Sequence, residues 1–125
     1  MAGQLTISTL SDGTNSTSST NCIQGSAKAW VNFNGNTGGV PSIRSSYNVS
    51  SVTTSGTGQY AINLTNALAD ANYSSPASLS INGSFATSNN VTLASWPASS
   101  SVVNLMASLS GTFYNCTYVS VSVFR

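Results

Sequence analysis

Ionisable side chains could do chemistry in this sequence, but they are scarce. Asp12 and Asp70 are the only acidic residues, and Lys28, Arg44 and Arg125 are the only basic ones, so the formal net charge is +1. Acid–base catalysis needs a group that exchanges protons near neutral pH, most often a histidine or a carboxylate with a shifted pKa. The chain has no histidine, and its two carboxylates are far apart in the sequence. We therefore expect no enzymatic activity.

Metal and phosphate sites are equally unsupported. Metal ions are held by clusters of histidine, cysteine or carboxylate ligands, and the chain has too few of these residues. Glycines gather at Gly35–Gly39 and Gly56–Gly58, but neither group has the lysine and following helix of a phosphate-binding loop. The sequence therefore predicts no metal and no cofactor.

Cys22 and Cys116 are the only cysteines. They could form a disulfide, but a pair of free thiols is the interpretation that we favour, because a protein assembled in a reducing cytosol keeps its thiols reduced. A measurement of mass under non-reducing conditions separates the two alternatives.

The three cations are assigned structural roles or no role. We expect Lys28 and Arg44 to have structural roles, and Asp70 is one of the few ion partners that the sequence offers to Arg44. Exposed ion pairs contribute at most about 1 kcal/mol. Arg125 is interpreted as a solvated chain end, and hydrogen bonding across a subunit interface is its alternative role.

Composition indicates one folded domain with an uncharged polar surface. Only 4% of the 125 residues are charged, against about a quarter in ordinary domains, and Ser, Thr and Asn take their place. The hydrophobic fraction of 40% favours a folded chain over a disordered one. Three scattered cations form no nucleic-acid patch, and no stretch is long enough to span a bilayer. Met1–Leu10 also lacks the pattern of a secretory signal, so we expect a soluble protein that does not follow that export route.

Hydrophobic residues recur with a period of two, which predicts strands. In the clearest segment, Val119, Val121 and Val123 alternate with Tyr118, Ser120, Ser122 and Phe124. The eight expected strands lie at 5–10, 27–33, 43–53, 60–64, 73–82, 91–96, 102–107 and 117–124. Their short lengths and their Gly- and Asn-rich connections predict an all-β fold, an antiparallel β-sandwich that is jelly-roll-like or Ig-like.

Two segments depart from the simple strand pattern. Ile43–Thr53 has two separate apolar clusters, so we expect it to bend or bulge midway. Asn66–Asn72 is the only segment that suggests a helix, of one turn at most.

The N-terminal part differs in composition from the rest. Ser11–Asn21 is a polar, low-complexity linker, interpreted either as a long surface loop or as the base of an arm that reaches a neighbouring molecule. We divide the chain into an arm and linker at 1–21 and a β-sandwich at 22–125. Leu5 and Ile7 are the candidate docking residues of the arm.

Ten of the eleven aromatic residues fall into two groups. Six lie in expected strands and are assigned to the core or to a subunit interface: Trp30, Phe33, Tyr47, Tyr60, Tyr118 and Phe124. Four lie in or beside expected loops: Phe85, Trp96, Phe113 and Tyr114. Rings in the second group either cap the ends of the core or, beside amides such as Asn89 and Asn90, stack against sugars.

Several segments resemble a module of tailed-bacteriophage virion proteins that is typical of the C-terminal end of tail fibres. The resemblance is specific across residues 27–73 and at Tyr118–Arg125, and it is weak across 74–115. The segments that carry it begin with Ala27-Lys28-Ala29-Trp30-Val31-Asn32-Phe33-Asn34-Gly35 and continue with Ile43–Val52, Gly56–Leu64 and Asp70–Tyr73.

The resemblance implies a virion component exposed on the particle, assembled in the host cytoplasm as a homotrimeric knob. The familiar examples end long fibres, whereas this sequence begins at Met1 without a shaft. We therefore expect it to attach non-covalently to other virion proteins of the tail or capsid, through the N-terminal arm.

Three functional hypotheses follow. The first is a tail-fibre tip or receptor-binding adhesin, which contacts a host glycan or protein through the loops 82–90, 95–101 and 111–115. Its candidate contact residues are Phe85, Asn89, Asn90, Trp96, Phe113 and Tyr114. The second is a capsid decoration or head-fibre protein, which a copy number in the hundreds would favour. The third is a carbohydrate-binding module unrelated to phages.

Overall fold

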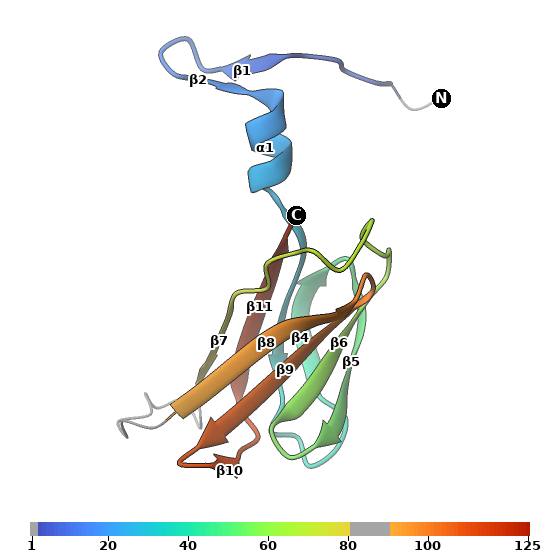
Figure 1. Cartoon of the computed structure of the whole chain (residues 1–125), viewed down its shortest axis with the longest axis vertical. Helices are drawn as coiled ribbons and strands as arrows, with labels where there is room; N and C mark the ends of the chain where they lie inside the picture. The colour runs from blue at the N-terminus through green and yellow to red at the C-terminus, as the bar shows by residue number, and fades with distance from the viewer. Residues whose placement is uncertain (1–2, 81–90) are drawn as a thin grey trace.

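Two antiparallel sheets face each other in the computed structural model, which describes residues 3–80 and 91–125. The four-stranded sheet has the order β4 (Ser42–Tyr47), β3 (Ala27–Asn34), β11 (Tyr118–Phe124) and β7 (Ala77–Ser80). The second sheet has the order β5 (Val49–Gly56), β6 (Gln59–Leu64), β9 (Val102–Leu109) and β8 (Val91–Ser99), and the short β10 (Thr112–Phe113) extends it beside β9. The two layers are seen in Figure 1 and confirm the all-β sandwich that the sequence predicts.

The core lies between the sheets and follows the period-two pattern. Every second residue of β3 and β11 is buried, namely Ala29, Val31, Phe33, Val119, Val121 and Val123. The second sheet contributes Tyr60, Ile62, Val103 and Leu105, and the Phe33 and Tyr60 rings meet edge to face with centroids 5.2 Å apart. Each large side chain buried in this way contributes about 1.5–3 kcal/mol. The sandwich is therefore stable through its own core.

The expected bend within Ile43–Thr53 is confirmed at Asn48. This residue adopts a φ of 55°, a left-handed conformation that asparagine tolerates better than most residues, and it divides β4 from β5. Its side-chain amide donates to the carbonyls of Lys28 and Asn66, at 3.0 and 3.2 Å. The chain thus crosses from one sheet to the other at a single fixed residue.

The helical turn expected at Asn66–Asn72 is wrong. The backbone N–H of Asn66 donates to Oδ1 of Asn48 at 2.8 Å, and that of Asn72 donates to Oδ1 of Asp70 at 2.8 Å. A helix would have paired the Asn72 N–H with the carbonyl four residues earlier, and the Asp70 side chain takes this donor instead. Within the described residues the one helix is α1 (Ser19–Gly25), which Ser18 caps by accepting from the Asn21 N–H at 3.1 Å.

Two expected strands are shorter than the pattern suggested. Of residues 5–10, only the last two belong to β1 (Thr9–Ser11), which pairs with β2 (Ser16–Ser18) in a separate hairpin. Of residues 73–82, those at 77–80 form β7, and Ser74 adds an isolated bridge to Phe124. Residues 81 and 82 lie outside the described part of the chain.

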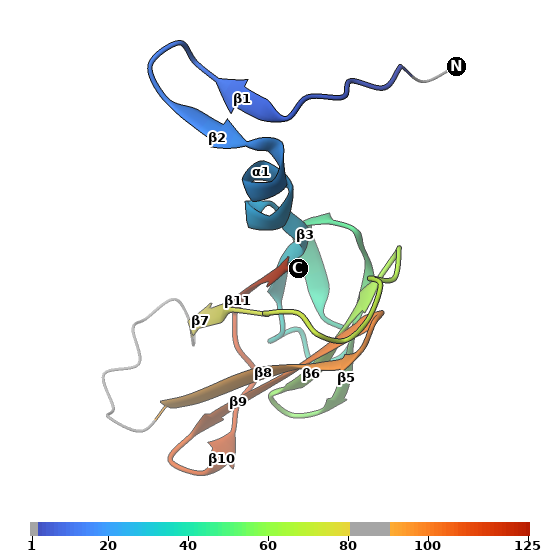
Figure 2. The ribbon, with the colours of Figure 1, turned by 45° about the horizontal axis from the view of Figure 1, so that its top comes forward.

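The N-terminal segment projects from the sandwich as an arm, as Figure 2 shows. We use the name arm for residues 3–26, which comprise the hairpin and α1. Lys28 joins the arm to the sandwich, because its ammonium donates to the carbonyl of Ile23 and to Oγ of Ser26, the latter at 2.9 Å. In the part of the chain that the structure describes, no helix has the length and apolarity needed to cross a membrane.

Candidate functional site

The predicted contact residues that the structure describes lie in two different places. Phe85, Asn89 and Asn90 fall outside the described residues. Phe113 and Tyr114 lie at the end of the sandwich opposite the arm, where Figure 1 labels β10, and are 40% and 41% exposed. Trp96, 42% exposed, belongs to β8 rather than to a loop, because that strand continues to Ser99. The expected loop at 95–101 is therefore wrong for most of its length.

Trp96 borders a small hollow on the outer face of the second sheet. It lies opposite Asn104 of β9, and the hollow of about 80 Å³ is also lined by Ser55 and Gln59. An indole face beside two amides and a hydroxyl offers stacking together with hydrogen bonds. This combination suits a sugar ring, although the hollow is small.

Phe113 and Tyr114 are held by a buried network around Tyr60. Asn115 Oδ1 accepts from the Gly58 N–H at 2.8 Å and lies 3.3 Å from the Tyr60 hydroxyl. The same hydroxyl accepts from the Cys116 N–H at 3.2 Å. Burial raises the pKa of Tyr60, so its hydroxyl stays protonated at neutral pH. The two exposed rings are consequently mounted on a rigid base.

Glycine is required at two positions of this base. Gly58 has a φ of +66°, and a Cβ there would lie 2.5 Å from the carbonyl oxygen of Ala107. A Cβ on Gly35 would overlap the Tyr60 ring. Both backbones approach their neighbours more closely than any side chain allows.

The sequence analysis missed three exposed aromatic residues on the four-stranded sheet. Trp30, Tyr47 and Tyr118 are 39%, 58% and 48% exposed, so their assignment to the core is wrong, and the subunit-interface alternative stays a prediction. Phe33 and Tyr60 are core residues as expected, and Phe124 is half-buried. The alternation of Trp30 with Ala29 and Val31 already carried this signal.

Arg44 lies across the same outer face. Its guanidinium carbon is 4.3 Å from the centroid of the Tyr118 ring, and one guanidinium nitrogen donates to the Thr117 carbonyl at 2.7 Å. Another guanidinium N–H makes a long contact of 3.5 Å with Oδ1 of Asn32. Arg44 is thus held flat against the sheet by an aromatic ring and a carbonyl.

Asp70, one of the few ion partners that the sequence offers to Arg44, does not pair with it. Asp70 pairs with Arg125 at 2.6 Å, and Arg125 is an exposed chain end, as expected, that also has this ion partner. The hydrogen bond from Arg125 lowers the pKa of Asp70 to about 2. All five charged residues belong to the described chain, and no carboxylate forms a salt bridge with Arg44.

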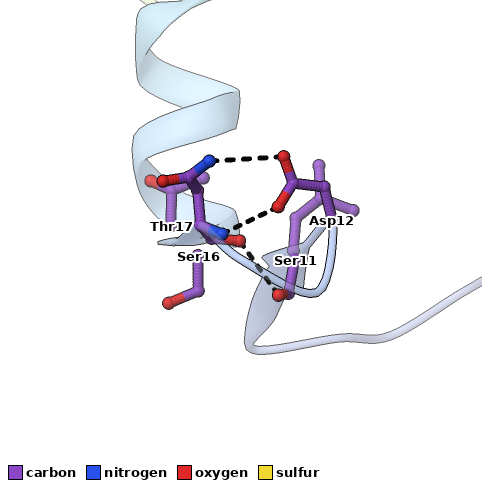
Figure 3. A pocket seen from close by; sticks show the side chains of 6 residues that line it. Ser11, Asp12, Ser16 and Thr17 are labelled. Carbon is purple, nitrogen blue, oxygen red and sulfur yellow. Dashed lines mark hydrogen bonds between the residues drawn. The ribbon is translucent and has the colours of Figure 1, made fainter.

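Asp12 is committed to the turn of the arm hairpin. Its carboxylate accepts from the N–H groups of Asn15 and Thr14 at 2.7 and 3.0 Å, and these bonds lower its pKa. Asp12 and Ser11, drawn in Figure 3, both bond to Asn15. They line a hollow of about 460 Å³. A carboxylate used in this way is ionised at neutral pH and holds the turn.

Leu5 and Ile7, the predicted docking residues, are 82% and 41% exposed. They line an apolar groove of about 370 Å³ together with Leu10, Cys22 and Ile23. No described residue of α1 is buried. The arm therefore presents an apolar surface that residues 3–80 and 91–125 leave uncovered.

The two cysteines are free, as the sequence analysis favoured, and the disulfide alternative is wrong. Cys22 is partly exposed on α1, whereas Cys116 is fully buried in the sandwich. Burial raises the pKa of the Cys116 thiol to about 11.

Comparisons with protein-family models, with curated protein sequences and with solved structures find no match to this chain.

Proposed function

We propose that this chain is a phage virion protein, a tail-fibre tip or receptor-binding adhesin that its arm attaches to the particle. The sandwich then faces the host and makes the receptor contact. The resemblance of residues 27–73 and 118–125 to tail-fibre ends supports this proposal and also supports assembly as a homotrimer.

The division of exposed apolar side chains between the two parts of the molecule carries the proposal. On the arm they are aliphatic and gathered around one groove, which suits burial against another protein. On the sandwich the large exposed ones are mainly aromatic and lie among Ser and Asn, which suits reversible contact with a polar ligand. Attachment at one end and recognition on the rest is the arrangement that an adhesin needs.

A particle-incorporation experiment tests the attachment role of the arm. We expect the double change Leu5→Asp and Ile7→Asp to remove the chain from purified particles without changing its thermal unfolding, because neither side chain is buried. Val40→Asp is the matched control, since Val40 is 78% exposed on the sandwich and its substitution should leave incorporation intact.

Quantitative mass spectrometry of the particles gives both incorporation and copy number. A handful of copies, located on the tail by gold labelling, supports the adhesin hypothesis. Hundreds of copies on the head would show that the chain is a capsid decoration protein instead. A solution size near three times 12.8 kDa supports the trimer. Absence of the unmodified chain from particles overturns the proposal.

A further inference from the structure

A groove crosses the outer face of the four-stranded sheet beside the exposed aromatic residues. It has a volume of about 270 Å³ and lies between β7 and β11, with Ser120 and Ser122 as its hydroxyl-bearing floor and Phe124 and Pro76 beside them. Trp30 is paired with Ser122 and therefore stands on the same face, and Tyr47 is paired with Trp30. Aromatic side chains thus accompany a row of hydroxyl groups.

The polar groups of this face are linked into one network. Asn32 donates to Oγ of Ser120 at 2.8 Å, which leaves the hydroxyl proton of Ser120 for another acceptor. The oxygen of the Asn32 amide faces Arg44. Arg44 has five N–H donors and no acidic partner, and its guanidinium is already oriented by Tyr118 and Thr117. The network therefore offers donors and one uncompensated positive charge.

We infer that this face binds an acidic polysaccharide, a chain of sugar rings that carry carboxylate groups. Rings would stack on Trp30 and Tyr47, their hydroxyls would meet Ser120 and Ser122, and a carboxylate would pair with Arg44. From Tyr118 to Phe124 the strand extends for about 20 Å, which accommodates several rings in a row. The inference gives the proposed adhesin a ligand class and rests on that function for its biological setting.

Charge distinguishes this ligand from a second copy of the chain. Packing identical faces together around a two-fold axis would bring Arg44 side chains together without any carboxylate to neutralise them. Such burial of unpaired charge is costly, whereas an acidic ligand supplies the missing partner. The arm groove has no cation and is the more suitable surface for contact between proteins.

Calorimetric titration of the full chain with an oligogalacturonate at low salt tests the inference. The fully methyl-esterified oligomer is the control ligand, because it keeps the sugar backbone and lacks the charge. We expect binding of the acid form and about tenfold weaker binding of the ester. Arg44→Gln should weaken binding of the acid form about tenfold and leave binding of the ester unchanged. Trp30→Ala should weaken binding of both forms.

Arg125→Gln is the matched control variant, since it removes one arginine charge at the Asp70 pair and should leave affinity unchanged. Equal losses in Arg44→Gln and Arg125→Gln would show attraction by net charge alone and overturn the inference. Failure of both ligands to bind would also overturn it. A change of oligomer size in Trp30→Ala would identify the face as a subunit interface instead. None of these outcomes alters the particle-incorporation result, so the two proposals fail separately.

Discussion

The arm and the sandwich differ in what stabilises them, although the same few residue types build both. In the sandwich, alternate side chains of facing strands meet in a continuous core. In the arm, which contains a two-stranded hairpin and a seven-residue helix, Leu5, Leu10 and Ile23 are exposed, and no described residue is buried. Isolated hairpins and short helices are marginal in water. The comparison teaches that the sandwich has a core within its own strands, whereas the described residues of the arm have none.

Truncation of the core should produce the largest contrast between the two regions. Phe33→Ala removes a fully buried ring that packs against Tyr60, so we expect the free energy of unfolding to fall by about 3–5 kcal/mol. Leu5→Ala in the arm should change it by less than about 0.5 kcal/mol. Chemical denaturation followed by tryptophan fluorescence measures both. A similar loss in the two variants would mean that arm and sandwich unfold as one unit.

Substitution of glycines should give the next largest effect. Gly58→Ala combines a left-handed φ with overlap against Ala107, and we expect a loss of about 3 kcal/mol. Gly13 in the arm also has a positive φ, +94°, but nothing lies within 4 Å of a Cβ there. Gly13→Ala should therefore strain the hairpin and leave the melting temperature of the sandwich unchanged. An equal fall in melting temperature would contradict this separation.

Substitution of the two cysteines should have the smallest effect on stability. Burial raises the pKa of Cys116 from 9.0 to about 11, so the unfolded chain releases this proton at lower pH than the folded chain. Its contribution to stability is complete below pH 9 and is lost as the pH rises towards 11. Cys116→Ala should reduce the loss of unfolding free energy between pH 9 and pH 11, and Cys22→Ala should not. The remaining decline comes from Tyr60 and Tyr73, whose pKa values are also raised by burial.

Thiol labelling sharpens the same comparison at neutral pH. A maleimide should modify Cys22 quickly and Cys116 only as fast as the sandwich opens. Rapid modification of Cys116 in the folded protein would contradict the fully buried position of its sulfur. Intact-mass spectra taken over time distinguish one modified thiol from two.

The sequence predicts the sandwich well because alternation is a local signal. The alternating apolar residues that end at Phe33 and at Val123 mark the buried faces of β3 and β11. This pattern can be recognised without knowing which strands pair with them. The same alternation places Trp30 and Tyr118 outside, but their aromatic character led to an assignment to the core. Periodicity was the better guide, because a sheet has two faces and only one lies against the core.

Tertiary contacts explain what the sequence could not predict. The pairing of Asp70 with Arg125 depends on bringing residues 55 positions apart together, and the place of Arg44 depends on Tyr118 crossing beneath it. The helix lies at Ser19–Gly25 rather than Asn66–Asn72 because Ser18 caps the first segment, while the Asp70 carboxylate accepts from the Asn72 N–H in the second. Neither outcome follows from propensity alone.

The position of β11 has a consequence for how the molecule is made. This strand lies between β3 and β7, and its Ser120 bonds to Asn32, which is 88 positions earlier in the chain. The central pairing of one layer thus waits until residues 118–124 have been synthesised, and closing so long a loop is slow. During that interval β3 exposes an unpaired edge, and chaperone capture or misassembly with other nascent chains competes with folding.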